Sequence, residues 1–135
     1  MKKLICIIAL CSLLFSLCSC DGHFSSYKAI GLVRSNTAHS CNTSFLSLDG
    51  RLVFKLKKTD SSDEGQISYS VSVDSGELHL YYDIYGTEEE LVNVKAGESV
   101  SGKGGYIEGR KTVYIIIEAV SGTRGKVSVE LNGED

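Results

Sequence analysis

Apolar and polar residues alternate along most of the chain after residue 24, which is the pattern of strands with one face in a core. The alternation is clear in Leu52–Leu56, Ile67–Val73, Leu78–Ile84 and Val127–Leu131. Thr112–Val120 differs, because both of its faces are apolar. We expect this segment to be a central strand that is buried on both sides.

Turn signals that contain glycine separate these runs and recur at intervals of about 8 to 12 residues. They are Asp49-Gly50, Asp74-Ser75-Gly76, Tyr85-Gly86, Ala96-Gly97, Gly104-Gly105, Gly109, Ser121-Gly122 and Gly125. Thr87–Val92 is open to two interpretations, a helical turn capped by Thr87 or an acidic hairpin loop. The spacing is typical of an all-β, antiparallel sandwich or barrel of short strands, and we expect a sandwich of about seven or eight strands in residues 43–135, which the resemblance given below implies to be jelly-roll-like.

The first 19 residues have another pattern, with Lys2 and Lys3 followed by the apolar run Leu4–Leu17. This run has the length of a secretory signal and is shorter than the ~20 residues of a membrane-spanning helix. Leu17-Cys18-Ser19-Cys20 then resembles the bacterial lipobox, in which an aliphatic residue and two small ones precede the cysteine that is acylated. An ordinary secretory signal, with cysteines as apolar filler, is the alternative.

The lipobox resemblance implies a signal peptide over residues 1–19 and a lipoprotein whose acyl chains, such as palmitate, are attached to Cys20. Such a protein faces the outside of the cytoplasm, at the cell surface or in the periplasm. Asp21, directly after the cysteine, resembles the inner-membrane retention signal of enteric bacteria, but that rule does not carry to all lineages, so the membrane leaflet stays open. Residues 20–42 are then expected to hold the lipid anchor and either a tether or a first strand. Several acyl chains make attachment effectively permanent.

Removal of residues 1–19 leaves about 115 residues and a net charge near −5, because two lysines leave with the signal. This length suits one domain. The acidity argues against a nucleic-acid partner, whose protein footprint is basic. Lys55-Leu56-Lys57-Lys58 is a local exception, which we interpret as a solvated strand edge rather than a site for nucleic acid or lipid headgroups.

Residue chemistry gives little support for catalysis. Once Cys20 is acylated, Cys41 has no cysteine to pair with, and although His39 is near in sequence, we expect Cys41 to be a small, partly buried residue rather than a nucleophile. No nucleophile, base and orienting group can be assembled, so we expect a protein that is not an enzyme and needs no cofactor or metal. The acids of two polar loops are interpreted as solvated charge rather than a calcium site; they are Asp60, Asp63, Glu64 and Glu88–Glu90.

One strand face has the composition of a ligand site. Opposite the core side of Leu78–Tyr85 lie His79, Tyr81, Asp83 and Tyr85. Tyrosine rings beside polar groups can stack on a sugar and hydrogen-bond its rim. In the alternative interpretation, this face packs on a second sheet or makes ordinary cross-strand pairs.

The order of features from Arg51 to Leu131 carries a second resemblance. It rests on Gly76-Glu77-Leu78-His79-Leu80, Lys95-Ala96-Gly97-Glu98, Tyr114–Ala119 and Gly125–Val129. This order resembles the small jelly-roll-type sandwiches of exported bacterial proteins, of the prepeptidase C-terminal type. The resemblance implies a module that binds, spaces or stabilises. Our main hypothesis is an interaction or accessory module at the cell envelope, with an envelope protein or a glycan as partner. The alternative is a carbohydrate or small-ligand binder.

Overall fold

The computed structural model describes residues 23–59, 61 and 64–132. The expected signal peptide, the acylation site Cys20, and two of the acidic loop residues, Asp60 and Asp63, lie outside the described residues. In the segments that are described, no helix is long and apolar enough to cross a membrane.

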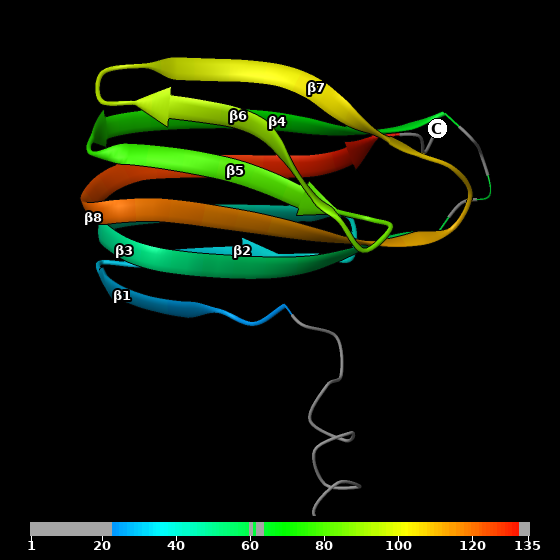
Figure 1. Ribbon diagram of the computed structural model, residues 1–135, viewed down its shortest axis with the longest axis horizontal. Coiled ribbons are helices and arrows are strands. Elements are labelled where there is room, and N and C mark those ends of the chain that lie inside the picture. Colours follow the sequence, from blue (N-terminus) through cyan, green and yellow to red (C-terminus); the bar gives the residue numbers. More distant parts are fainter. Residues whose placement is uncertain (1–22, 60, 62–63, 133–135) are drawn as a thin grey trace, which may run out of the picture.

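The described residues form an all-β fold of eight strands, which confirms the expected fold class (Figure 1). The strands are β1 (Ser26–Ile30), β2 (Val33–Asn36), β3 (Ser40–Lys58), β4 (Gly65–Ser75), β5 (Glu77–Asp83), β6 (Glu88–Lys95), β7 (Ser99–Ile107) and β8 (Lys111–Asn132). Residues 20–42, expected to hold an anchor and a tether or first strand, thus include β1, β2 and the beginning of β3.

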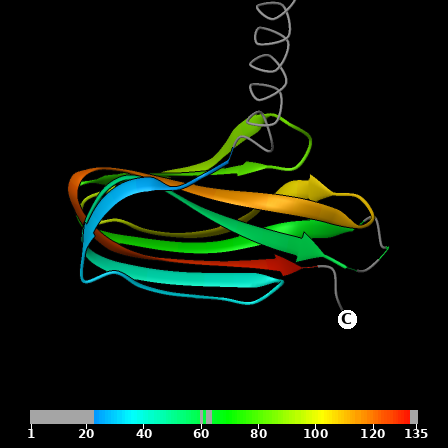
Figure 2. The same ribbon diagram turned by 90° about the horizontal axis from the view of Figure 1, so that it is seen from below.

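Two long strands, β3 and β8, pair with each other and run through both layers of the sandwich (Figure 2). In the first layer, the strand order is β6-β5-β8-β3-β1, and it uses the Lys111–Ala119 half of β8. In the second layer, the order is β7-β4-β8-β3-β2, and it uses the Thr123–Asn132 half. All these pairings are antiparallel, so one continuous sheet folds over on itself.

Glycines placed where turns were predicted instead bend these continuous strands. Asp49-Gly50 lies inside β3, and Ser121-Gly122 lies inside β8. The β3–β8 register shifts between Phe45 and Gly50, as expected for β-bulges, which bend a strand and sharpen its twist. The prediction that the chain reverses at these two positions is therefore wrong. Gly104-Gly105 likewise lies inside β7 rather than in a turn.

The core lies between the two layers and is built from the alternating apolar positions. The Thr112–Val120 segment is central, as expected, and Ile115, Ile116 and Ile117 are fully buried in succession. Cys41 is in the same core. Other buried core residues are Phe45, Leu48, Leu52, Phe54, Leu56, Ile67, Val71, Val73, Leu78, Leu80, Val94, Ile107, Val113, Ala119, Val127, Val129 and Leu131.

The acidic segment that begins at Glu88 forms an edge strand, β6, and neither a helical turn nor a hairpin loop. It pairs with β5 from Glu77↔Lys95 to Asp83↔Glu88, and its Val94 is buried in the core. Pairing and burial therefore outweigh the weak strand preference of glutamate, because tertiary context decides β propensity.

The lysine-rich end of β3 lies at a strand edge, as the sequence-based interpretation expects, although Lys58 is buried rather than solvated. On one side it pairs with β8, from Lys55↔Tyr114 to Lys58↔Lys111. On the other side, the amide of Lys57 donates to the carbonyl of Ala38. β1 pairs with β3 only from Ser47 to Arg51, so among the described residues no strand pairs with Lys55–Lys58 on that side.

Candidate functional site

The predicted tyrosine face lies on the outside of the first layer and is not sandwiched between the layers. His79, Tyr81 and Asp83 pair with Glu118, Ile116 and Tyr114 of β8. The His79 and Tyr81 rings stack with centroids 6.0 Å apart. Tyr85 lies beyond the end of β5, is 64% exposed, and has the Lys111 ammonium 6.0 Å from its ring centroid.

Asp83 has a structural role on this face. Its side chain is almost fully buried, and its Oδ1 accepts a hydrogen bond from the amide of Gly86 at 2.7 Å. Its Oδ2 lies 2.7 Å from Nε2 of His23, whose ring is 4.6 Å from that of Tyr114. Asp83 therefore fixes both the turn after β5 and the segment that leads into β1, and its oxygens already have partners.

Arg51 connects the charged groups of the same face. Its guanidinium donates to Glu118 at 2.9 Å and forms a close ion pair with Glu88. The hydrogen bond to Glu88 raises the pKa of Arg51, and the same bond lowers the pKa of Glu88. The carboxylates of Glu88 and Glu118 are therefore engaged in ion pairs with Arg51 rather than arranged around a metal site.

The other acids of β6 also have protein partners. Glu89 accepts a hydrogen bond from the hydroxyl of Tyr82, which is the main reason that the pKa of Tyr82 rises to about 12. Glu90 lies 3.4 Å from Nδ1 of His79. Among the described residues, no group of three His, Cys, Asp or Glu side chains is arranged to hold a metal ion.

Cys41 lies in the core and is 1% exposed, so it is buried more deeply than the sequence predicts. Burial raises the pKa of its thiol to about 12, against an opposing effect of Arg34. The side chain of His39 interacts with the backbone instead: its Nδ1 lies 2.8 Å from the carbonyl oxygen of Lys57. A thiol with this pKa remains protonated at neutral pH, so it is a poor nucleophile.

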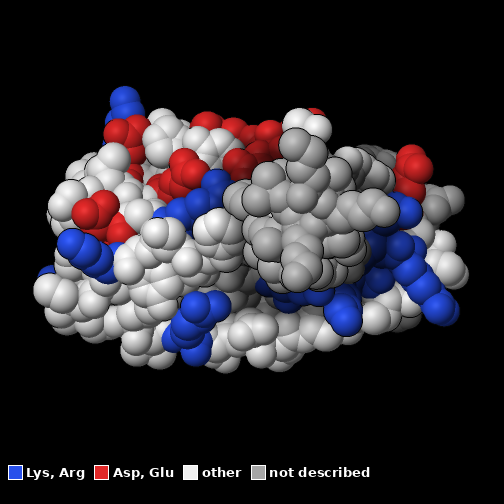
Figure 3. All heavy atoms as spheres, turned by 60° about the horizontal axis from the view of Figure 1, so that its bottom comes forward, with Lys and Arg blue, Asp and Glu red and all other residues white. Residues whose placement is uncertain are grey.

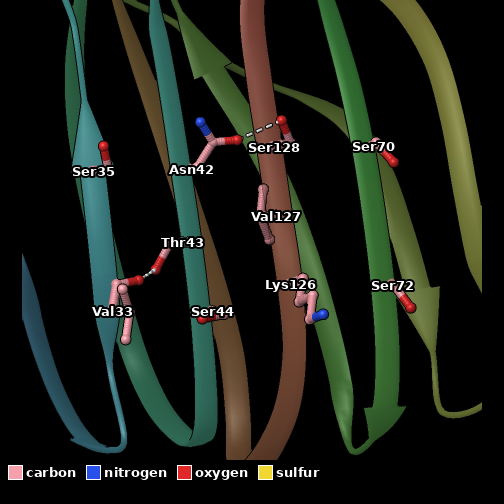
Figure 4. Close-up of a pocket in the computed structure, with 10 residues that line it drawn as sticks. All are labelled: Val33, Ser35, Asn42, Thr43, Ser44, Ser70, Ser72, Lys126, Val127 and Ser128. Carbon is pink, nitrogen blue, oxygen red and sulfur yellow. Dashed lines mark hydrogen bonds between the residues drawn. The ribbon is translucent and has the colours of Figure 1, made fainter.

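A groove of about 460 Å³ lies on the outer face of the second layer (Figure 4). It runs across β2, β3, β8 and β4, on the opposite side of the sandwich from the tyrosine face. Its lining residues are Val33, Ser35, Asn42, Thr43, Ser44, Ser70, Ser72, Lys126, Val127 and Ser128. No pattern in the sequence predicts this groove, which we call the serine groove.

The strand register arranges the polar side chains of the serine groove in two rows. The first row is Ser35–Asn42–Ser128–Ser70, continued by Ser101 of β7. The second row is Val33–Ser44–Lys126–Ser72, continued by Ser99. Side chains that pair in this way share one face of the sheet.

Hydrogen bonds between neighbouring strands orient these side chains. Ser128 donates to Oδ1 of Asn42 at 2.7 Å, which leaves the Asn42 amide nitrogen pointing away from Ser128 (Figure 4). At the other end of the row, Ser101 donates to Ser70 at 3.1 Å. The groove therefore presents pre-oriented hydroxyl and amide groups on a rigid sheet, with Lys126 as the one charged group in its lining.

No family model matches the sequence, and a search of curated proteins found no match. Several solved structures are similar in fold. A family 29 carbohydrate-binding module in complex with mannohexaose is 13% identical, with a TM-score of 0.46, over 81% of this chain and 82% of that one. A family 61 carbohydrate-binding module in complex with β-1,4-galactotriose is 16% identical, with a TM-score of 0.45, over 85% and 74% of the chains.

A xylanase from Cellvibrio japonicus in complex with xylopentaose is 14% identical, with a TM-score of 0.42. The match covers 82% of this chain but 27% of the xylanase. These likenesses are too distant to carry a function from those proteins to this one.

Proposed function

We propose that this protein is a non-catalytic binding module, tethered to a bacterial membrane through Cys20, whose serine groove takes a hydroxyl-rich, glycan-type ligand. The observation that carries the proposal is the groove itself. Its volume of about 460 Å³ lies within the range of ordinary small-ligand sites. Its polar groups are fixed on paired strands, so binding costs little side-chain entropy.

The chemistry of the groove suits a neutral polyol better than a charged or purely apolar ligand. Serine hydroxyls both donate and accept hydrogen bonds, as the hydroxyls of a sugar do, and the Asn42 amide adds donors. Val33, which is 65% exposed, supplies apolar surface for the carbon skeleton. One lysine among ten lining residues gives the groove little charge.

The serine groove is a better site than the tyrosine face that the sequence suggested. On the tyrosine face, Asp83, Glu88 and Glu118 bind His23 or Arg51, and displacing them would break ion pairs. His23 also lies against this face, so the chain enters the fold there. The groove is on the opposite layer and thus faces away from the proposed anchor.

The site is tested by isothermal titration calorimetry of the unacylated Cys20→Ser protein against a panel of soluble glycans. Replacing Asn42 and Ser128 together with alanine should weaken binding at least about fivefold, since one net hydrogen bond contributes roughly 1 kcal/mol. The matched control replaces His79 and Tyr81 with alanine and should leave affinity unchanged. The opposite pattern would move the site to the tyrosine face, and no binding by any glycan would refute the proposal.

The tether has a separate test. A Cys20→Ser variant expressed in a bacterial host should lose the acyl mass and leave the membrane fraction. If the variant partitions as the native protein does, the lipobox assignment is wrong. This measurement does not depend on any ligand, so it separates the anchor from the groove.

A protein-interaction role is the second candidate, and an exposed apolar corner favours it. Ile30, Val33 and Leu46 are each more than half exposed. Leu46 packs closely on Gly31, because a Cβ added to Gly31 would lie 2.7 Å from the Cγ of Leu46. Exposed apolar clusters mark interaction surfaces. A photo-crosslinking residue at Leu46 should capture one reproducible envelope protein in cells, whereas the same probe at the exposed Lys95 should not. Equal capture at both positions would exclude this role.

A further inference from the structure

Five cationic side chains gather at one end of the sandwich, where β3 ends and β8 begins. A hollow of about 320 Å³ there is lined by Lys57, Lys58, Thr59, Arg110, Lys111 and Thr112. The pairs Lys57↔Thr112 and Lys58↔Lys111 hold the two strands together at this point. Lys55, two residues before Lys57, projects on the same face of β3. We call these five cations the basic corner; in a protein of net charge −3 they form a local reversal of sign.

Most of the charge of the basic corner is not neutralised by carboxylates. Among the described residues, no ion pair involves Lys57, Arg110 or Lys111, and all three side chains are exposed. Lys58 is different, because it is 3% exposed and its ammonium donates to the carbonyl of Gly109 at 3.0 Å. Lys58 thereby fixes the turn that carries Arg110 and Lys111.

The basic corner lies beside the segment that leads to the proposed anchor. His23, Phe24 and Ser25 line a hollow together with Lys55 and Tyr114. His23 is held to Tyr114 by ring contact, and Tyr114 pairs with Lys55. Cys20 precedes His23 by three residues, which span at most about 11 Å. Lys and Arg side chains gather on the right of Figure 3, whereas most Asp and Glu side chains lie toward its top.

We infer that the basic corner binds the phosphate groups of anionic phospholipids in the membrane that carries the anchor. The lysines and arginine supply the charge that attracts such a surface, and the Thr112 hydroxyl adds a hydrogen-bond donor. With the anchor and the basic corner at the lipid surface, the serine groove of the opposite layer points away from it. The inference rests on the tether in the proposed function and is independent of the ligand of the groove.

The test uses the unacylated chain from residue 20 onward, with Cys20→Ser, which contains all eight strands and the whole described core. Its partition coefficient is measured by co-sedimentation with vesicles of phosphatidylcholine alone or of phosphatidylcholine mixed with phosphatidylglycerol. The protein should bind the anionic vesicles and not the neutral ones. Lys57→Ala and Lys111→Ala should each lower the partition coefficient about fivefold, since a cation at an anionic surface contributes about 1 kcal/mol.

Matched controls are Lys95→Ala and Lys103→Ala, which remove the same charge from exposed positions of β6 and β7. They should change the partition coefficient by less than twofold, and all variants should retain the circular dichroism spectrum of the parent chain. Equal losses in the controls would show attraction without a defined surface and overturn the inference. Equal binding to neutral vesicles would do the same, as would saturable binding of inorganic phosphate without preference for anionic vesicles. No glycan and no acyl chain is present, so these outcomes are separate from failure of the groove or the tether.

Discussion

Gly50 and Gly122 offer a matched pair of substitutions that tests how the long strands bend. Both have positive φ, 117° and 79°, and they lie in the central strands β3 and β8. They differ in the space around them. A Cβ on Gly50 would lie 2.4 Å from the Ser26 carbonyl oxygen and 2.9 Å from the Tyr27 Cα, whereas a Cβ on Gly122 would meet nothing within 4 Å.

The expected costs follow from this difference. Gly122→Ala carries only the backbone strain of an L-residue at positive φ, about 1–2 kcal/mol, partly offset by about 0.4–1 kcal/mol from the less flexible unfolded chain. Gly50→Ala carries strain of similar size and also pushes β1 away from β3, because both contacts are to backbone atoms that cannot move alone. Loss of even two β1–β3 hydrogen bonds adds about 2 kcal/mol, for a total of at least about 3 kcal/mol.

Urea denaturation of the unacylated protein, followed by circular dichroism, measures both values. With a slope of about 2 kcal/mol per molar urea, Gly122→Ala should shift the midpoint by about 0.5 M and Gly50→Ala by about 1.5 M or more. If Gly50→Ala destabilises the protein no more than Gly122→Ala does, the close packing of β1 on the bend of β3 is not what requires glycine there, and the reasoning fails.

Three further predictions concern single buried or paired groups. Thr123 is fully buried, with its hydroxyl 2.6 Å from the Val120 carbonyl oxygen, so Thr123→Val should reduce the free energy of unfolding by about 1–3 kcal/mol; a loss below about 0.5 kcal/mol would contradict this role. Cys41 should react with a thiol reagent only after denaturant is added, and fast labelling of the native protein would be incompatible with its burial and its pKa of about 12. Because Arg51 lowers the pKa of Glu88, their pair should contribute stability above about pH 4.5 that is lost as the pH falls through the lowered value; Arg51→Met should flatten this part of the urea midpoint–pH curve, and an unchanged curve would refute the assignment.

The sequence was sufficient for the parts of the fold that repeat every two residues. Alternation located the strands around Leu52, Ile67, Leu78 and Val127, and the doubly apolar segment around Ile116 is the central one. Burial of one face sets this pattern, so it can be recognised without knowing which strands pair.

Two features depended on pairing and could not be predicted. A glycine that ends a strand and a glycine that bends one look alike in sequence, so the sequence predicts turns at Gly50 and Gly122, where the strands in fact continue. The serine groove also needs the register, because Ser70 and Ser128 lie far apart in the sequence and meet only when β4 lies beside β8. In the sequence, Ser70 and Ser128 appear only as polar positions in segments where apolar and polar residues alternate.

The pairing of β3 with β8 also governs how the domain folds. Ser40 pairs with Glu130 and Lys58 with Lys111. The centre of both layers therefore cannot form until β8, the last strand in the described order, is available. Such distant pairing places folding in the millisecond-to-second range typical of sandwiches. Proline is absent, so no slow isomerisation phase is added. Because β3 and β8 form the centre of both layers, neither layer is complete without the other. The groove and the opposite face therefore form and melt in one cooperative step.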